Sequence, residues 1–222
     1  MKGISIGNDI VALANTNPAR TKEKRFYSKF LTEAEVELYF NNTYSFSFEQ
    51  FIWLCWSVKE SVFKFQQRLQ PELSFAAGQI NIQKIIAPLK QQLFFAEREV
   101  FEYDLLPIEN AYTSIALINS FPFYSHSFIT NEFIYTITAA EAHSNNISWG
   151  IKRIESPSYD IQSKSVRIFA SQKIANVLNT DQADILKTET GYPIIKQHPQ
   201  LPVSFTHHYH FIGYAFLTKK VA

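Results

Sequence analysis

The chain has 222 residues, of which 46 % are hydrophobic and 15 % aromatic, so it can bury a substantial core as one large domain or two domains of about 110 residues. Charged residues make up 18 % and the net charge is +1, which excludes a general attraction to nucleic acid or to an anionic membrane. Any anionic ligand must therefore be held by a local site. The single cysteine, Cys55, excludes an internal disulfide framework and fits a reducing compartment.

The N-terminus does not have the form of a signal peptide, because Asn8 and Asp9 interrupt its apolar run. Residues 111–131 carry no Asp, Glu, Lys or Arg, but Ser, Asn, Pro and His recur every few positions, which argues against a membrane span. We therefore expect a soluble cytoplasmic protein.

Turn signals and hydrophobic periodicity predict the elements of the first half. Residues 3–14 are expected to form a strand that ends at a polar turn. A short helix is expected after Thr32, because residues 32–35 have the form of a capping box. A long helix is predicted from about Phe48 to Leu69, where apolar residues recur with a period near 3.6 and Pro71 follows. Strands are expected near 79–86, 92–104, 112–118 and 132–139.

The second half repeats the pattern of one long helix and several strands. Polar stretches at 143–146 and 155–160 indicate a boundary, and a helix is predicted over 163–178. Strands are expected near 183–187, 193–196, 202–206 and 211–217. These elements predict an α+β fold with two similar-sized halves, each a long helix packed on a small, mainly antiparallel sheet. The expected organisation is a first half over 1–145, a linker over 146–162 and second-half elements over 163–222.

Three charged residues lie inside the long, very aromatic helix. Glu60 and Lys64 are four residues apart and could form an ordinary helix ion pair. Lys59 lies about 140° around the helix from Lys64 and is left without a partner in the sequence pattern. Two ammonium groups and a carboxylate also suit a phosphate-rich ligand with a divalent cation, because lysines bind phosphate oxygens and carboxylates bind hard metal ions.

Asp9 is the candidate for a second carboxylate, since it interrupts an otherwise apolar strand. A strand-end aspartate that caps a turn is the alternative. If Asp9 and Glu60 share one Mg²⁺, their carboxylates must lie within about 8 Å of each other and on the same side of the sheet.

Three motifs resemble those of the 4′-phosphopantetheinyl transferase superfamily. The strand "IGNDIV" (6–11) is similar to the family's first motif, and "RFYSKFLTEAE" (25–35) to its second. The third motif, Trp-[Ser/Ala]-x-Lys-Glu-[Ser/Ala]-x-x-Lys, matches "WSVKESVFK" (56–64) at every defined position. The order and spacing of the three motifs strengthen the resemblance.

The resemblance implies an enzyme that moves the phosphopantetheine arm of coenzyme A onto a serine of an apo acyl- or peptidyl-carrier protein and releases 3′,5′-ADP. It implies Mg²⁺ held by Asp9 and Glu60, with Glu60 also taking the serine proton. Lys59 and Lys64 would bind phosphates, and Lys64 would stabilise the charge on the diphosphate. Glu35 matches the acidic residue of the second motif, and a capping-box role explains it equally well.

Residues 163–217 resemble the N-terminal half of the larger, surfactin-synthetase-activating type, so the two halves occur in swapped order. The resemblance implies that Thr206 and His207 hold the 3′-phosphate and ribose of coenzyme A and that Ser163 lies near the adenine. It also implies a monomeric pseudo-dimer whose Met1 and Ala222 lie close together. A zinc site in the run from Thr206 to His210 is disfavoured, because neighbouring strand residues face opposite ways and no cysteine cluster is present.

Three positions depart from the family pattern. Asn8 replaces Ile or Val beside the metal aspartate, and Val11 stands where the larger type often has a third carboxylate. Tyr192 replaces a coenzyme A-binding lysine, for which Lys196 or Arg167 could substitute. These departures keep an alternative open: a protein on the same scaffold that binds coenzyme A or a carrier protein with impaired catalysis.

Overall fold

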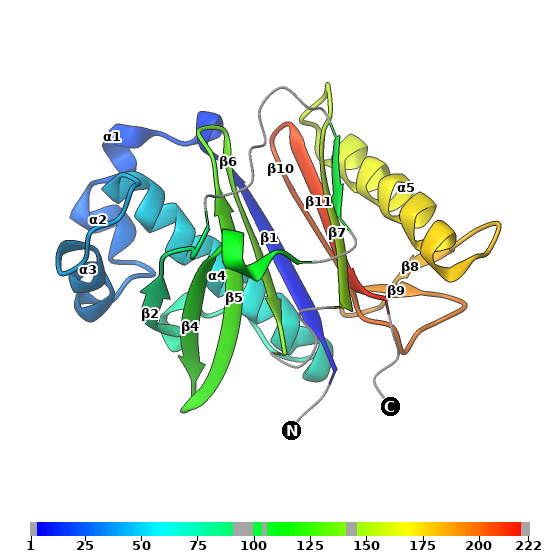
Figure 1. Cartoon of the computed structure of the whole chain (residues 1–222), viewed down its shortest axis with the longest axis horizontal. Coiled ribbons are helices and arrows are strands. Elements are labelled where there is room, and N and C mark those ends of the chain that lie inside the picture. Colours follow the sequence, from blue (N-terminus) through cyan, green and yellow to red (C-terminus); the bar gives the residue numbers. More distant parts are fainter. Residues whose placement is uncertain (1–3, 91–99, 104–105, 141–145, 219–222) are drawn as a thin grey trace.

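The structure is a computed structural model that describes residues 4–90, 100–103, 106–140 and 146–218 (Figure 1). The fold is α+β, as the sequence predicts. The helices are α1 (Pro18–Thr21), α2 (Lys24–Tyr27), α3 (Glu33–Phe40), α4 (Phe48–Leu69) and α5 (Tyr159–Leu178). The strands are β1 (Ile6–Ala12), β2 (Asn81–Ile86), β3 (Val100–Tyr103), β4 (Tyr112–Ile118), β5 (Phe121–Ile129), β6 (Phe133–Ala139), β7 (Ile147–Arg153), β8 (Ile185–Lys187), β9 (Pro193–Ile195), β10 (Val203–His208) and β11 (Phe211–Leu217).

Two antiparallel sheets form the body of the protein. The first has the strand order β1-β6-β5-β4-β2 and the second the order β10-β11-β7-β3, while β8 and β9 form a small separate ribbon. A core that includes Tyr135 and Phe128 of the first sheet and Trp149 and Phe211 of the second joins the two sheets. Helix α4 packs on the first sheet and α5 on the second, as Figure 1 shows.

Local sequence signals fix the limits of α4. The side chains of Ser47 and Gln50 form a capping box at its start, as those of Thr32 and Glu35 do at the start of α3. The ends of α4 at Phe48 and Leu69 are those that the periodicity predicted. The helix lies unusually close to β1: a Cβ atom at Gly7 would be 1.9 Å from the backbone oxygen of Ser61. Glycine is required at position 7 by this close approach.

Side chains, rather than a backbone ladder, link β1 to β10. The amides of Asn8, Ile10 and Ala12 donate hydrogen bonds to the side chains of Ser204, Thr206 and His208, respectively, each at 3.0 Å. The three amides of β1 and the three side chains of β10 are each spaced by two residues and follow the same chain direction. One face of β10 therefore covers the free edge of β1. This seam brings elements that are almost 200 residues apart into register.

Several predicted elements agree with the structure and others differ. The strands at 112–118, 132–139 and 211–217 are confirmed to within a residue. Strand β5 was not predicted, because the polar residues of "FPFYSHSFI" conceal a segment that is buried on both faces at 125–128. Most of the strand predicted over 92–104, and the expected proximity of Met1 and Ala222, lie outside the described residues.

The boundary between the halves also differs from the prediction. Residues 147–153, expected to belong to a linker, form β7, which pairs with β11 on one side and β3 on the other. Ile147, Trp149 and Ile151 alternate into the core, and the helix that follows begins at Tyr159. Since β3 comes from the first half of the chain, the second sheet is built from both halves. The symmetry of a pseudo-dimer stays a prediction.

Among the described residues, no helix is both long and apolar enough to cross a membrane.

The buried histidine of β5 makes the stability dependent on pH. Burial lowers the pKa of His126 to about 4, from an ordinary value of 6.5. The unfolded chain therefore binds the proton more readily, and the stability that the neutral histidine confers is present above pH 6.5 and is lost as the pH falls towards 4. We expect the loss to reach about 2–3 kcal/mol.

The His126→Gln variant should remove this part of the pH dependence. Denaturant unfolding of the wild type and the variant at pH 7.5, 6, 5 and 4.5 would measure it. We expect the difference in unfolding free energy between them to shrink on acidification, and a difference that is constant with pH would contradict this account.

Candidate active site

Three charged side chains meet where α4 crosses β1. The Lys64 Nζ lies 3.2 Å from Asp9 Oδ1 and 3.1 Å from Glu60 Oε1, and it donates a hydrogen bond to the Asn8 carbonyl at 3.0 Å. Asp9 comes from β1, whereas Glu60 and Lys64 lie one turn apart on α4. Because both carboxylates lie within 3.2 Å of one nitrogen, their nearest oxygens cannot be farther apart than twice that distance. This separation is inside the limit of about 8 Å expected for groups that share one Mg²⁺.

The three groups differ in exposure and in the pKa shift that results. Burial raises the pKa of Asp9 to about 7, and the negative charge of Glu60 adds to the effect. Burial also opposes ionisation of Glu60, but the positive charge of Lys64 together with hydrogen bonds from Lys64, Trp56 and Asp9 outweighs it, so the pKa of Glu60 is lowered. The two carboxylates in turn outweigh burial at Lys64 and raise its pKa. Glu60 and Lys64 are therefore charged at neutral pH, with 29 % and 23 % of their side-chain surfaces exposed.

The second oxygen of Asp9 supports a cation site. Asp9 is 3 % exposed, and its Oδ2 is buried without a hydrogen-bond partner among the described residues. The Ser57 hydroxyl, one turn before Glu60 on α4, is also buried, and it lies close enough to Asp9 to help lower the pKa of that carboxyl. A bare carboxylate oxygen beside a second carboxylate is the donor set that a hard divalent cation prefers. The residues present therefore fit Mg²⁺.

Asn8 does not contribute to this donor set. Its side chain points to the opposite face of β1, where Nδ2 donates to the Tyr135 hydroxyl at 3.0 Å and that hydroxyl donates to the Tyr214 carbonyl at 2.8 Å. The departure at position 8 therefore changes the core between the sheets rather than the surroundings of Asp9.

Lys59 lies away from the site and is fully buried. Its ammonium lies 2.8 Å from Glu35 Oε1 and 2.9 Å from Oε2, and it donates to the carbonyls of Phe30 at 2.6 Å and Ala77 at 3.2 Å. Each of its protons thus has an acceptor inside the protein, which leaves none for a phosphate. Glu35 also caps α3 and accepts a hydrogen bond from the Ile82 amide. The contacts of Lys59 and Glu35 are therefore those of structural residues.

Of the three residues predicted from the second half, Thr206 and His207 belong to β10 and Ser163 to α5. The Thr206 hydroxyl donates to Asp9 Oδ1 at 3.2 Å, so its one proton is already used. His207 is half-buried, and its ring contacts that of Tyr159 at 5.3 Å. Burial and the nearby charge of Lys64 lower the pKa of His207. Ser163 accepts a hydrogen bond from Arg167 at 2.8 Å.

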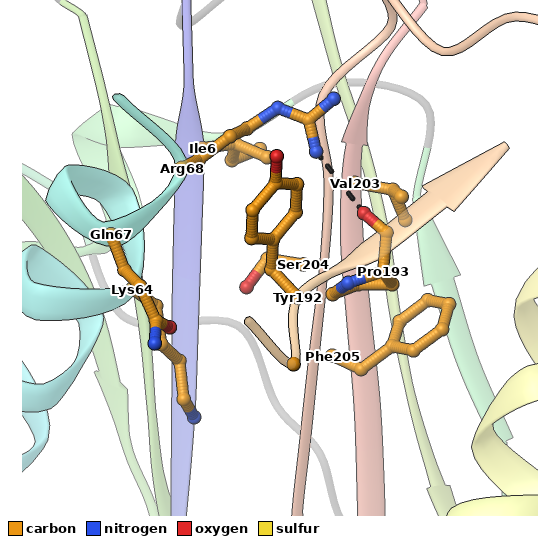
Figure 2. A pocket seen from close by; sticks show the side chains of 10 residues that line it. Ile6, Lys64, Gln67, Arg68, Tyr192, Pro193, Val203, Ser204 and Phe205 are labelled. Atoms are coloured by element: carbon orange, nitrogen blue, oxygen red, sulfur yellow. Dashed lines mark hydrogen bonds between the residues drawn. The ribbon is translucent and has the colours of Figure 1, made fainter. Parts of the chain in front are cut away.

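A pocket of about 110 Å³ opens beside Lys64. Figure 2 shows Lys64 and Gln67 of α4 on one flank and Pro193 and Phe205 on the other. Tyr192 also lines it, with its ring 5.5 Å from the Arg68 guanidinium, which donates to the Pro193 carbonyl at 3.1 Å.

The two residues considered as substitutes for the missing lysine are placed differently. Lys196 is 4.0 Å from Asp184. Arg167, in contrast, lies near enough to His207 to help lower its pKa.

The sequence prediction did not include Ser57 as a site residue, although its spacing of seven from Lys64 places both on one face of α4. The zinc alternative finds no support, since the described residues contain no group of three or more His, Cys, Asp or Glu side chains placed to hold a metal.

The site thus combines two carboxylates and an ammonium group beside a pocket, which are groups that can bind a divalent cation and a phosphate. Residues 5–112 match the sequence model of the 4′-phosphopantetheinyl transferase superfamily. This part of the chain is a domain of that superfamily, whose members transfer phosphopantetheine groups. No curated protein and no solved structure matches the chain. The match ends before the second half, and the swapped order stays a prediction.

The structural role of Lys59 can be tested with Lys59→Met. Removal of the ammonium leaves Glu35 buried without its counter-charge, and we expect the unfolding free energy to fall by about 3–5 kcal/mol. At a temperature where the variant is folded, its KM for coenzyme A should equal that of the wild type. Denaturant unfolding and steady-state kinetics would measure these two effects.

The Lys59→Met/Glu35→Gln double variant is the control, since it removes the unpaired charge, and it should recover part of the lost stability. A Lys59→Met protein that is as stable as the wild type but has a raised KM would instead favour phosphate binding by Lys59.

Proposed function

We propose that the protein transfers the 4′-phosphopantetheine arm of coenzyme A to a serine of an apo carrier protein, with Mg²⁺, and releases 3′,5′-ADP. The observation that carries the proposal is the meeting of Asp9 and Glu60 around Lys64, with a buried, bare oxygen on Asp9. The superfamily match over the segment that supplies all three residues supports this interpretation.

Asp9 and Glu60 are the proposed Mg²⁺ ligands. The bound ion would neutralise charge on the diphosphate of coenzyme A. Lys64 carries a positive charge beside both carboxylates and is proposed to stabilise the charge that develops on the diphosphate oxygen when its bond to phosphorus breaks. Lys64 is partly exposed at the pocket, so its ammonium, unlike that of the fully buried Lys59, can exchange a protein acceptor for a phosphate oxygen.

Glu60 is the proposed acceptor of the serine proton. Its lowered pKa keeps the carboxylate ionised at neutral pH. Its partial exposure allows contact with the serine hydroxyl of the carrier protein, directly or through a water molecule. The serine oxygen forms a bond to the phosphorus that carries the pantetheine arm. The bond from that phosphorus to the bridging oxygen breaks, and 3′,5′-ADP leaves with the electron pair.

His207, Ser163 and Arg167 are proposed to hold the 3′-phosphate end of coenzyme A. Arg167 supplies a guanidinium that can bind phosphate oxygens in place of the missing lysine at 192. The charges of Lys64 and Arg167 both act on His207, which supports a shared role of these residues in binding one anionic ligand.

A basic segment beside α4 is proposed to receive the carrier protein. Five exposed basic side chains lie within ten residues: Arg20, Lys22, Lys24, Arg25 and Lys29. Phe26 and Phe30, from this segment, contact Trp53 and Trp56 of α4, with ring centroids 5.8 and 5.1 Å apart. Since Trp56 lies one turn before Glu60, an acidic partner bound here would place its serine near the carboxylates.

The transfer can be tested by mass spectrometry. The protein would be incubated with coenzyme A, Mg²⁺ and a panel of apo carrier proteins, and the mass added to each carrier measured. We expect Glu60→Ala to lower transfer by at least about 100-fold with the fold intact, because the variant lacks both a cation ligand and the proton acceptor. Glu72→Gln, an exposed change just beyond α4, is the control and should behave as the wild type.

Two outcomes would contradict the proposal in different ways. Wild-type rates in Glu60→Ala would remove Glu60 from the mechanism. Binding of coenzyme A without added mass on any carrier would favour the alternative of a catalytically impaired binding protein, for which the phenol of Tyr192 in place of a lysine is the supporting observation.

The basic segment can be tested by charge reversal at Lys22, which no acidic side chain in the described structure pairs. We expect Lys22→Glu to raise the KM for the apo carrier by about 3–10-fold, with the KM for coenzyme A unchanged and the effect reduced at high salt. Lys84→Glu, at an exposed position of β2, makes the same charge change away from the segment and is the control. Equal carrier KM values for the two variants would place the partner elsewhere.

A further inference from the structure

Thr206 connects the second half of the chain directly to the candidate cation site. Its hydroxyl oxygen accepts the Ile10 amide proton at 3.0 Å, and its own proton is donated to Asp9 Oδ1 at 3.2 Å. The residue is 3 % exposed, so water does not compete for either bond. The hydroxyl is thus held by β1 backbone on one side and directed at the carboxylate on the other.

The surroundings of Thr206 keep its side chain in one orientation. Ser204 and His208, two residues to either side, make the same kind of bond to β1 and fix the position of β10. Thr206 pairs with Gly213 of β11, and a Cβ atom at Gly213 would lie 3.2 Å from the Thr206 methyl carbon. The methyl group therefore fills the space that this glycine leaves, and a β-branched residue has few other rotamers available.

Two hydrogen-bond donors, Lys64 and Thr206, share one oxygen of Asp9. Oδ1 lies within 3.2 Å of both Lys64 Nζ and the Thr206 hydroxyl, while Oδ2 has no hydrogen-bond partner among the described residues. Two donors on one oxygen restrict rotation of the carboxylate about its last bond. Oδ2 is consequently kept free as a ligand atom at a defined position.

We propose that Thr206 is a positioning residue that orients Asp9 for the divalent cation, a role that rests on the proposed function. Hydrogen-bond partners of metal ligands set the orientation of those ligands, and their loss typically costs about 10–100-fold in metal affinity or activity. Thr206 lies outside the segment matched by the superfamily model. The cation site is therefore complete only when β10 is docked on β1.

Three variants separate the positioning role from a structural one. Thr206→Val keeps the size and the methyl group but loses both hydrogen bonds of the hydroxyl. Thr206→Ser keeps the hydroxyl and loses the methyl group. Ser204→Ala is the matched control, because it also removes a side-chain acceptor from a β1 amide, that of Asn8, but has no bond to Asp9.

The measurement is the binding of Mg²⁺ alone to each full-length variant by isothermal titration calorimetry at pH 8, without coenzyme A or carrier protein. Thermal unfolding of each variant would establish that all are folded at the temperature used. We expect Thr206→Val to weaken the Mg²⁺ affinity by about 10-fold or more. Thr206→Ser should stay within about threefold of the wild type, and so should Ser204→Ala, even if its melting temperature falls as far as that of Thr206→Val.

The outcomes distinguish this inference from the proposed function. If the wild type binds Mg²⁺ and folded Thr206→Val binds it equally well, Thr206 has a structural role only, and the inference is overturned while the proposed function stands. An equal loss of affinity in Ser204→Ala and Thr206→Val would also overturn it, because the effect would then come from the seam as a whole. Absence of Mg²⁺ binding by the wild type would overturn both.

Discussion

The close packing of α4 on β1 is the constraint on which the site depends. With no side chain at Gly7, the backbone of α4 reaches the strand at Ser61, closer than any residue with a Cβ atom would allow. One turn of α4 then suffices to bring Glu60 and Lys64 against Asp9. A larger residue at position 7 would push the helix outwards and separate the two carboxylates. The glycine two residues before the aspartate thus determines the geometry of the charges without touching them.

The same helix shows two ways to accommodate an ammonium group in apolar surroundings. Lys59 is buried completely, and it is stabilised by a carboxylate and two carbonyls inside the protein. Lys64 keeps part of its surface exposed and lies between two carboxylates that are themselves candidates to bind a cation. Separation of the buried pair would leave an uncompensated charge inside the protein, so Lys59 keeps its partners. A partly exposed one, beside a pocket and a bare carboxylate oxygen, can still exchange partners with a ligand.

The sequence predicted α4 well, because a regular apolar period and a following proline agree there, and the capping box of Ser47 and Gln50 in the structure reinforces its start. It could also indicate Asp9, Glu60 and Lys64, since charges in apolar segments need partners. It could not separate Lys59 from Lys64, because the distinction depends on Glu35, which tertiary packing brings from α3. Strand β7 was expected to belong to a linker. Five of its residues are buried, but the strands that pair with it, β3 and β11, are distant in sequence and leave no local signal. The hydrogen bond from Thr206 to Asp9 spans 197 residues, and no local pattern could indicate it.

The seam between β1 and β10 has a mechanical consequence. Strand β1 keeps its full backbone pairing with β6, and β10 keeps its own with β11, while only side chains cross between them. The two sheets therefore meet without a shared ladder, and these side-chain bonds, together with the common core around Trp149 and Tyr135, hold them in register. Any variant that alters the relative position of the two sheets would therefore also alter the surroundings of Asp9, because its Oδ1 accepts the Thr206 hydroxyl across the seam.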